Sequence, residues 1–157
     1  MNRFFALQIL FVTLLGARQD YSGPRPPQKD TVYLVHADQL VATEVGMATK
    51  QAMGDNVTYI VPGERSTVRT PLASPTLVIE AGNLNADKLR LFRLDVRNGH
   101  REMRFDYKGR GGAMPLRADI ANVADGLYRI DVVDSLADGE YALSPDGAND
   151  VFCFEVF

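Results

Sequence analysis

The stretch Leu127-Tyr-Arg-Ile-Asp-Val-Val-Asp-Ser-Leu-Ala-Asp-Gly-Glu-Tyr-Ala-Leu143 decides the fold class of this chain. It opens with Leu127–Val133, a run rich in the β-branched and aromatic residues that favour strands. A corner containing Ser, Asp and Gly follows, and a second short strand is expected over Glu140–Leu143. The turn-rich segment Ser144–Asp150 and a last strand, Val151–Phe157, complete this third of the chain. It is therefore expected to form consecutive strands joined by turns.

The same pattern extends toward the N-terminus. Further short β-rich runs, bounded by Pro, Gly and Asn, are found at Val32–Val35, Val57–Val61, Thr76–Glu80 and Pro115–Ile120. Many short strands with turn residues between them are typical of a β-sandwich.

Val41–Met53 is the only helix candidate. It contains Gly46 and lacks a clean 3.6-residue apolar stripe, so an edge strand followed by a loop is the alternative. The sequence predicts an all-β, antiparallel β-sandwich of about seven to nine strands with at most one short helix. This domain is expected to span residues 31–157, with alternate side chains meeting in a single interior.

A hairpin is predicted around Asn98-Gly99, because this pair favours a type I′ turn with positive φ at both residues. The resulting register pairs Arg97 with His100 and Leu94 with Met103. One face then carries the apolar residues Phe92, Leu94, Met103 and Phe105, and the other carries the charged residues Arg93, Asp95, Glu102 and Arg104. On the charged face, the diagonals Arg93–Glu102 and Asp95–Arg104 join opposite charges.

The stretch 127–143 resembles strands E and F of an immunoglobulin-like sandwich. In that family a Tyr just past the E–F corner hydrogen-bonds to backbone a few residues upstream. Asp138-Gly-Glu-Tyr141 occupies that place, so the resemblance implies that Tyr141 is a structural corner residue and that Val151–Phe157 is strand G. The chain departs from antibody domains because it has no Trp and a single Cys.

The whole chain also resembles uncharacterised secreted proteins of environmental bacteria. The similar pieces are Tyr33–Asp38, Val61–Gly63, Arg69–Leu72 and Gly139–Gly147. This resemblance implies export and carries no assigned activity.

Residues Met1–Ala17 are typical of a signal peptide, with Arg3 before an apolar run and Gly16-Ala17 at the expected cleavage site. A retained N-terminal anchor is the alternative, although the run is short for a membrane-spanning helix. Residues 18–30 contain three Pro and one Gly, so we expect an extended arm or linker there. The mature protein is expected to be secreted or periplasmic, with no membrane span after the signal peptide is removed.

No catalytic, cofactor-binding or metal-binding set of residues is expected from the sequence. His36 and Asp38 would share one face of a strand and could form half of a metal site or an oriented base, whereas His100 is interpreted as a turn residue. Ser144–Asp150 has oxygen-bearing side chains at spacings that suit a calcium loop, but its composition is more typical of a plain turn. Cys153 is interpreted as a small core residue, with a thiol that pairs with another chain as the alternative.

Charge is distributed unevenly along the chain. Residues 88–117 carry a net charge of +6, whereas the rest of the mature chain carries −10. Such a cationic surface could dock an acidic protein or an anionic polymer, or drive self-association, and its candidate residues are Arg90, Arg93, Arg97, Arg101, Arg104, Lys108 and Arg110. The interpretation we favour is a solvated sheet face with cross-strand ion pairs. The overall charge of −3 does not suggest a nucleic-acid-binding protein.

We therefore expect an exported, non-catalytic binding or structural protein that presents a surface to a protein or to an anionic envelope partner. Three alternatives remain open. They are a carbohydrate-binding module, which the absence of Trp weakens, a subunit of an extracellular assembly or filament, and a small secreted hydrolase using His36, Asp38 or other carboxylates.

Overall fold

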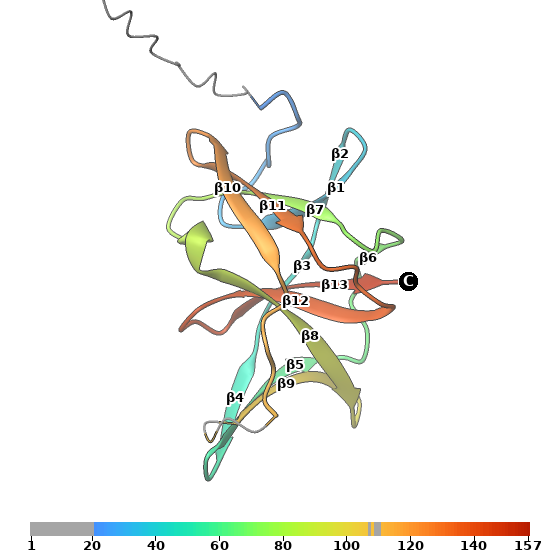
Figure 1. The fold of residues 1–157 in the computed structure, drawn as a ribbon, viewed down its shortest axis with the longest axis vertical. Helices are drawn as coiled ribbons and strands as arrows, with labels where there is room; N and C mark the ends of the chain where they lie inside the picture. Colours follow the sequence, from blue (N-terminus) through green and yellow to red (C-terminus); the bar gives the residue numbers. More distant parts are fainter. Residues whose placement is uncertain (1–20, 107, 109–110) are drawn as a thin grey trace, which may run out of the picture.

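The protein is built almost entirely of β-strands (Figure 1). The structure, a computed structural model, describes residues 21–106, 108 and 111–157. The expected signal peptide Met1–Ala17, residues 18–20 of the Pro-rich arm and Arg110 lie outside these residues.

The described strands form two antiparallel sheets, apart from one short parallel pairing. The five-stranded sheet has the order β10 (Ala118–Ala124), β11 (Leu127–Val132), β7 (Thr76–Glu80), β1 (Val32–His36) and β2 (Gln39–Ala42). The eight-stranded sheet has the order β3 (Glu44–Met47), β13 (Asp150–Val156), β12 (Gly139–Pro145), β8 (Leu89–Arg97), β9 (His100–Asp106), β5 (Asn56–Pro62) and β4 (Thr49–Met53). Its eighth strand, β6 (Arg69–Thr70), pairs in parallel with β13.

The predicted all-β sandwich is confirmed, but the described residues contain thirteen strands rather than seven to nine. The helix candidate Val41–Met53 does not form a helix, and the alternative of an edge strand is closer to the structure. This segment is extended and contributes to β2, β3 and β4, which pair with β1, β13 and β5. Its backbone groups hydrogen-bond to neighbouring strands. Because the segment has no apolar helical stripe, no apolar face would stabilise it as a helix. The described helical content is one 3₁₀ turn, Ala86–Lys88, and no helix there is long and apolar enough to cross a membrane.

An upper interior lies between the five-stranded sheet and strands β8, β12 and β13 (Figure 1). Leu77 and Ile79 of β7 and Ile130 of β11 pack there against Phe152 and Phe154 of β13. All five are almost completely buried. This interior holds the two sheets together.

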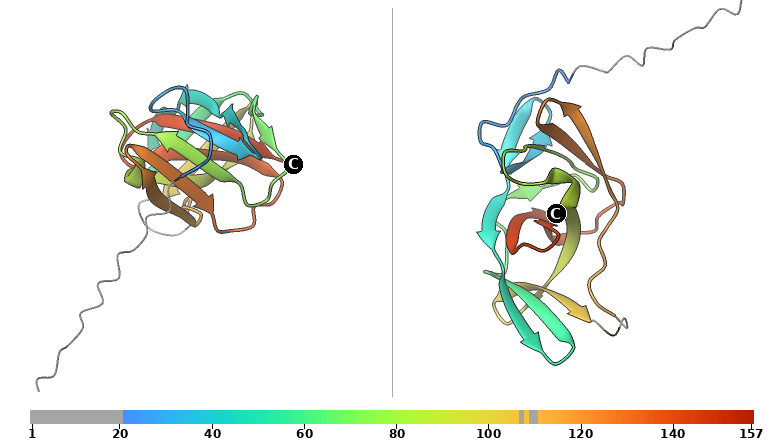
Figure 2. Two further views of the ribbon diagram at one scale, coloured as in Figure 1. Left: turned by 90° about the horizontal axis from the view of Figure 1, so that it is seen from above. Right: turned by 90° about the vertical axis from the view of Figure 1, so that its left-hand side faces the viewer.

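A lower interior lies on the opposite face of β12 and β13. The eight-stranded sheet curls until its edge strands β3 and β4 meet end to end at Ala48, and β4, β5 and β9 extend below the sandwich (Figure 2). Ala142, Val151 and Cys153 face this second space, together with Phe92. The expectation of a single interior is therefore wrong, because β12 and β13 are covered on both faces.

The Asn98-Gly99 turn forms as predicted, with φ of 50° at Asn98 and 82° at Gly99. The pairs Arg97–His100 and Asp95–Glu102 also have the predicted register. The ladder between β8 and β9 ends at Asp95, and residues Leu89–Leu94 of β8 pair along the other edge with β12. The apolar residues of the two strands still meet in the lower interior. Beyond the ladder, residues 113–116 bridge the two strands, with the Ala113 N–H donating to Arg104 and the Leu116 N–H to Leu91.

Tyr141 lies just past the corner between β11 and β12. Its hydroxyl donates a hydrogen bond to the carbonyl oxygen of Ala137 at 2.6 Å, and its ring stacks on Phe154. The sheet orders β10–β11–β7–β1 and β13–β12–β8 are consistent with the D–E–B–A and G–F–C orders of an immunoglobulin-like sandwich.

The described part of the Pro-rich arm ends in contact with the five-stranded sheet. Lys29 forms a β-bridge with Glu80, and the carboxylate of Asp30 accepts hydrogen bonds from the backbone N–H groups of Gly82, Asn83 and Leu84. Burial raises the pKa of Asp30, but these backbone bonds outweigh it, so the pKa lies below its usual value. The arm therefore enters the domain at a fixed point.

Candidate binding pocket

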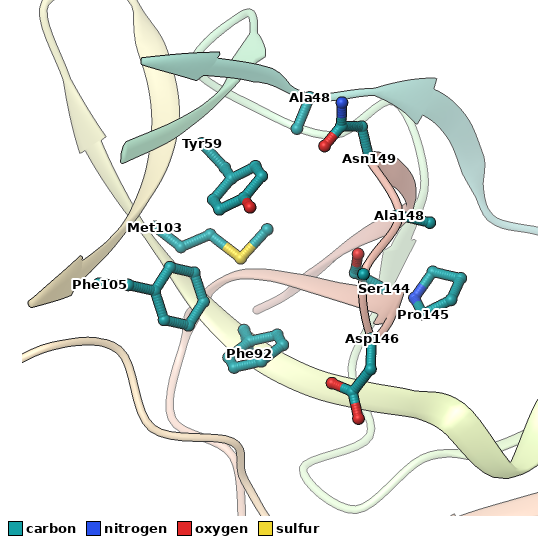
Figure 3. Close-up of a pocket in the computed structure, with 11 residues that line it drawn as sticks. Ala48, Tyr59, Phe92, Met103, Phe105, Ser144, Pro145, Asp146, Ala148 and Asn149 are labelled. Carbon is teal, nitrogen blue, oxygen red and sulfur yellow. The ribbon is translucent and has the colours of Figure 1, made fainter. Parts of the chain in front are cut away.

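An apolar pocket opens between the separated strands of the lower interior (Figure 3). Its volume is about 200 Å³. Its walls are the side chains of Tyr59 on β5, Phe92 on β8, and Met103 and Phe105 on β9, together with Ala48. The segment 144–149, which is the end of β12 and the loop to β13, closes the remaining side.

Strand alternation and the separation of β8 from β9 together position the aromatic side chains. Met103 and Phe105 are two residues apart on β9, so both point to the same face. The ring of Phe105 makes edge-to-face contacts with Tyr59, at 5.7 Å between centroids, and with Phe92, at 5.5 Å. This geometry is favourable for aromatic pairs and fixes the rings against one another.

The segment 144–149 is held by polar contacts at several points. The Ser144 hydroxyl donates to the Asp150 carbonyl at 2.8 Å, and the Asn149 carbonyl accepts from the Ala48 N–H at 2.8 Å. Asp146 forms an ion pair with Arg90 at 3.3 Å. Among the described residues there is no group of three or more His, Cys, Asp or Glu side chains that could hold a metal ion. The loop is a wall of the pocket.

One cation stands at the pocket without an acidic partner. The Nζ atom of Lys50 lies 6.0 Å from the centroid of the Tyr59 ring, and Lys50 makes no ion pair with the residues that the structure describes. Its side chain is exposed. The pocket therefore combines an apolar floor with an available positive charge at its edge.

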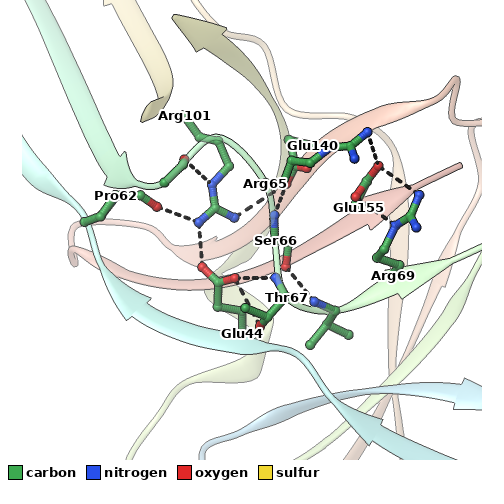
Figure 4. Close-up of polar contacts among 11 residues, drawn as sticks. Glu44, Pro62, Arg65, Ser66, Thr67, Arg69, Arg101, Glu140 and Glu155 are labelled. Carbon is green, nitrogen blue, oxygen red and sulfur yellow. Dashed lines mark hydrogen bonds and ion pairs between the residues drawn. The ribbon is translucent and has the colours of Figure 1, made fainter. Parts of the chain in front are cut away.

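The opposite end of the lower interior contains an ionic network (Figure 4). Arg101 is at its centre, and its side chain is 1% exposed. The guanidinium donates to the Gly63 carbonyl at 3.0 Å and the Pro62 carbonyl at 2.7 Å, and it forms ion pairs with Glu44 at 2.5 Å and Glu140 at 3.5 Å. The prediction that Arg101 belongs to a cationic surface is wrong. It alternates with Met103 and Phe105, so it points inward with them.

The pKa values of the two carboxylates that face Arg101 are shifted in opposite directions. Burial raises the pKa of Glu44, but hydrogen bonds from Arg101 and from the backbone N–H of Thr67 outweigh it, so the pKa lies below its usual value. The pKa of Glu140 lies above its usual value because burial dominates there, and the neighbouring Glu155 raises it further. Glu155 itself forms ion pairs with Arg69 at 2.9 Å and Arg65 at 3.4 Å.

Four other residues of the predicted cationic surface have carboxylate partners. Arg90 pairs with Asp146, Arg97 with Glu102 at 3.6 Å, Arg104 with Glu102 at 3.3 Å, and Lys108 with Asp55. Arg93 donates instead to the Asp138 carbonyl at 3.1 Å and lies over the Tyr141 ring. The predicted diagonals Arg93–Glu102 and Asp95–Arg104 do not form. The β8–β9 ladder ends at Asp95, so Arg93 has no paired residue on β9 and its guanidinium lies at the Asp138 carbonyl.

The histidines and the cysteine are placed apart from the pocket lining. His36 Nε2 lies 3.0 Å from the Thr70 hydroxyl, and no contact joins His36 to Asp38 among the described hydrogen bonds and ion pairs. His100 Nε2 lies 3.1 Å from Glu102. Cys153 is fully buried in the lower interior, as expected for a core residue, and burial raises the pKa of its thiol to about 12.

Sequence reasoning missed Tyr59 and Lys50 as site residues. They occupy paired positions on β5 and β4, and β4 comes from the segment that was the one helix candidate of the sequence. The alternation of Lys50 with Ala48 would have indicated a shared face, but only if that segment had been interpreted as a strand. A scan of protein-family models and searches of curated proteins and of solved structures each returned no match to this chain.

Proposed function

We propose that this chain is an exported, non-catalytic binding protein that holds an apolar group of its partner in the pocket between β5, β8 and β9. The observation that carries this proposal is the pocket itself, in which three aromatic rings and Met103 surround a space of about 200 Å³. A dry apolar cavity of about 150 Å³ is already enough to bind benzene in another protein. The volume therefore suits a single apolar group.

The pocket is also preformed. Its rings are held by edge-to-face contacts. The segment 144–149 is held by the hydrogen bond from the Ala48 N–H to the Asn149 carbonyl and by that from the Ser144 hydroxyl to the Asp150 carbonyl. A preformed site avoids the entropic cost of ordering loops and side chains when a ligand binds. This rigidity favours a binding role for the pocket.

The rest of the proposal follows the expectations from the sequence. An immunoglobulin-like sandwich supplies a stable scaffold, and a leader would export it to the periplasm or beyond. The cationic surface is a weaker candidate for the partner site, because four of its residues have carboxylate partners and Arg101 is buried.

Methyl-labelled methionine allows a direct test. Met103 lines the pocket, whereas Met47, Met53 and Met114 are exposed elsewhere and act as internal controls. Titration with toluene should shift the methyl resonance of Met103 in a saturable way and leave the other three unchanged. A Met103 resonance that does not respond, or four equal shifts, would contradict the proposal.

A matched pair of variants locates the effect. Ala48→Met extends a side chain from the pocket wall into the space and should abolish the response of Met103. Ala52→Met adds the same side chain at an exposed position of the same edge segment and should leave the response intact.

A further inference from the structure

We infer that the group held in the pocket is the C-terminal residue of an extended polypeptide, with its apolar side chain between the aromatic rings, its α-carboxylate at Lys50 and its backbone beside β4. This inference rests on the proposed binding function and specifies the partner. Charge, strand geometry and volume each support it.

The charge argument concerns Lys50. Two cations near the loop and the hairpin around the pocket have acidic partners, since Arg90 pairs with Asp146 and Lys108 with Asp55. Lys50 has no such partner among the described residues, and its ammonium stands over the Tyr59 ring of the pocket wall. A ligand that joins an apolar group to an anion would satisfy both features, because a charge-assisted bond to Lys50 complements the apolar floor.

The strand argument concerns the unpaired side of β4. In the described part of the chain β4 pairs with β5 alone. The Ala48 N–H points to the Asn149 carbonyl, away from β5. Backbone groups alternate along a strand, so those of Lys50 and Ala52 point to that same side. No described strand follows them there, and an extended peptide can pair with them by strand addition.

The volume argument selects one residue rather than a long acyl chain. A space of about 200 Å³ accommodates a side chain of the size of Leu or Phe. Strand pairing would place such a side chain on the Lys50 face of β4, which is the face that Ala48 presents to the pocket. Asp146 on the opposite wall forms an ion pair with Arg90, which reduces its repulsion of an incoming carboxylate.

The probes are N-acetylated tetrapeptides ending in Leu, prepared with a free carboxylate and as the matched amide. Binding is measured by fluorescence anisotropy and by the shift of the Met103 methyl resonance. We expect the carboxylate to bind about tenfold or more tightly than the amide, as a charge-assisted bond provides. Equal affinity of the two peptides would overturn the inference.

Four variants separate the contributions. Lys50→Met keeps most of the aliphatic stem and should remove the preference for carboxylate, whereas Lys29→Met, at an exposed lysine on the five-stranded sheet, should retain it. Ala52→Pro removes an N–H that does not face β5 and should weaken both peptides, whereas Ala52→Ser should not. Unchanged discrimination in Lys50→Met would refute the role of Lys50 even if Ala52→Pro does not fold.

Octanoate and toluene distinguish the ways of failing. One such outcome is that octanoate binds as tightly as the peptide carboxylate, with an affinity that Ala52→Pro does not change. This result would indicate a lipid-like acid as the ligand and overturn the inference. A saturable toluene shift at Met103 without any peptide binding would refute the inference alone. The absence of a toluene shift would refute the proposed function as well.

Discussion

The hydroxyl of Tyr141 donates a hydrogen bond to the carbonyl oxygen of Ala137, four residues earlier, across the corner that leads from one sheet to the other. Tyr141→Phe keeps the stacked ring and removes this bond, so we expect the free energy of unfolding to fall by about 1 kcal/mol. Urea denaturation measures the change. Tyr128→Phe is the control, because no described hydrogen bond involves its hydroxyl, and equal stabilities of the two variants would count against a special role for the corner.

Arg101 lies between two carboxylates in the interior, so its removal leaves buried charges without a partner. We expect Arg101→Met to destabilise the protein by about 3–5 kcal/mol, because breaking one side of a buried ion pair exposes the desolvation cost of the other. Arg97→Met, at an exposed neighbour in the same hairpin, should change the stability by no more than about 0.5 kcal/mol. Similar small losses in both variants would show that Arg101 is solvated.

Glu44 and Glu140 should titrate on opposite sides of the usual glutamate value of 4.5. The lowered pKa of Glu44 stabilises the fold above pH 4.5, and this contribution is lost as the pH falls through the folded-state pKa. The raised pKa of Glu140 contributes stability below pH 4.5 that is lost as the pH rises through its folded-state value. Carboxyl carbon chemical shifts followed against pH measure both, and Glu140 titrating below Glu44 would reverse the assignment.

Cys153 should be chemically inert in the folded protein. Burial raises the pKa of its thiol to about 12, and the reactive thiolate is therefore scarce at neutral pH. Treatment with a disulfide reagent at pH 8 should label no thiol in the native protein and one thiol per chain in denaturant. Rapid labelling of the folded protein would instead favour the alternative of a thiol that pairs with another chain.

Export predicts a defined N-terminus. Expression of the full chain in a bacterium with a general secretory pathway should yield a periplasmic or secreted product that begins at Arg18. Intact mass measurement reads the cleavage site. A product that retains residues 1–17 in the membrane fraction would support the retained anchor, and one that retains them in the cytoplasm would contradict export.

Local chemistry made several elements predictable from the sequence. Asn98-Gly99 specifies its own turn because Gly, and to a lesser extent Asn, tolerates positive φ. Thr76–Glu80 is bounded by Pro75 and Ala81-Gly82, and its strand has the predicted limits. In these cases the information lies within a few residues.

Long-range pairing made the rest unpredictable. The pocket lies where the β8–β9 ladder ends at Asp95, and there β8 is held along its other edge by β12, about fifty residues later. The strands of Val41–Met53 owe their conformation to three different partners, none of them evident from the segment itself. The burial of Arg101 was predictable, because its alternation with Met103 and Phe105 places its side chain on the inward face. Its positive charge favoured the interpretation as a surface residue instead.

Strands β12 and β13 form a wall shared by two interiors, and this has a consequence for protein engineering. Side chains on both faces of these strands are constrained, because those on one face pack in the sandwich and those on the other face pack in the lower interior. The pocket's other walls, on β5 and β9, do not contact the upper interior. New ligand specificity could therefore be engineered into those two strands while the scaffold above keeps its packing.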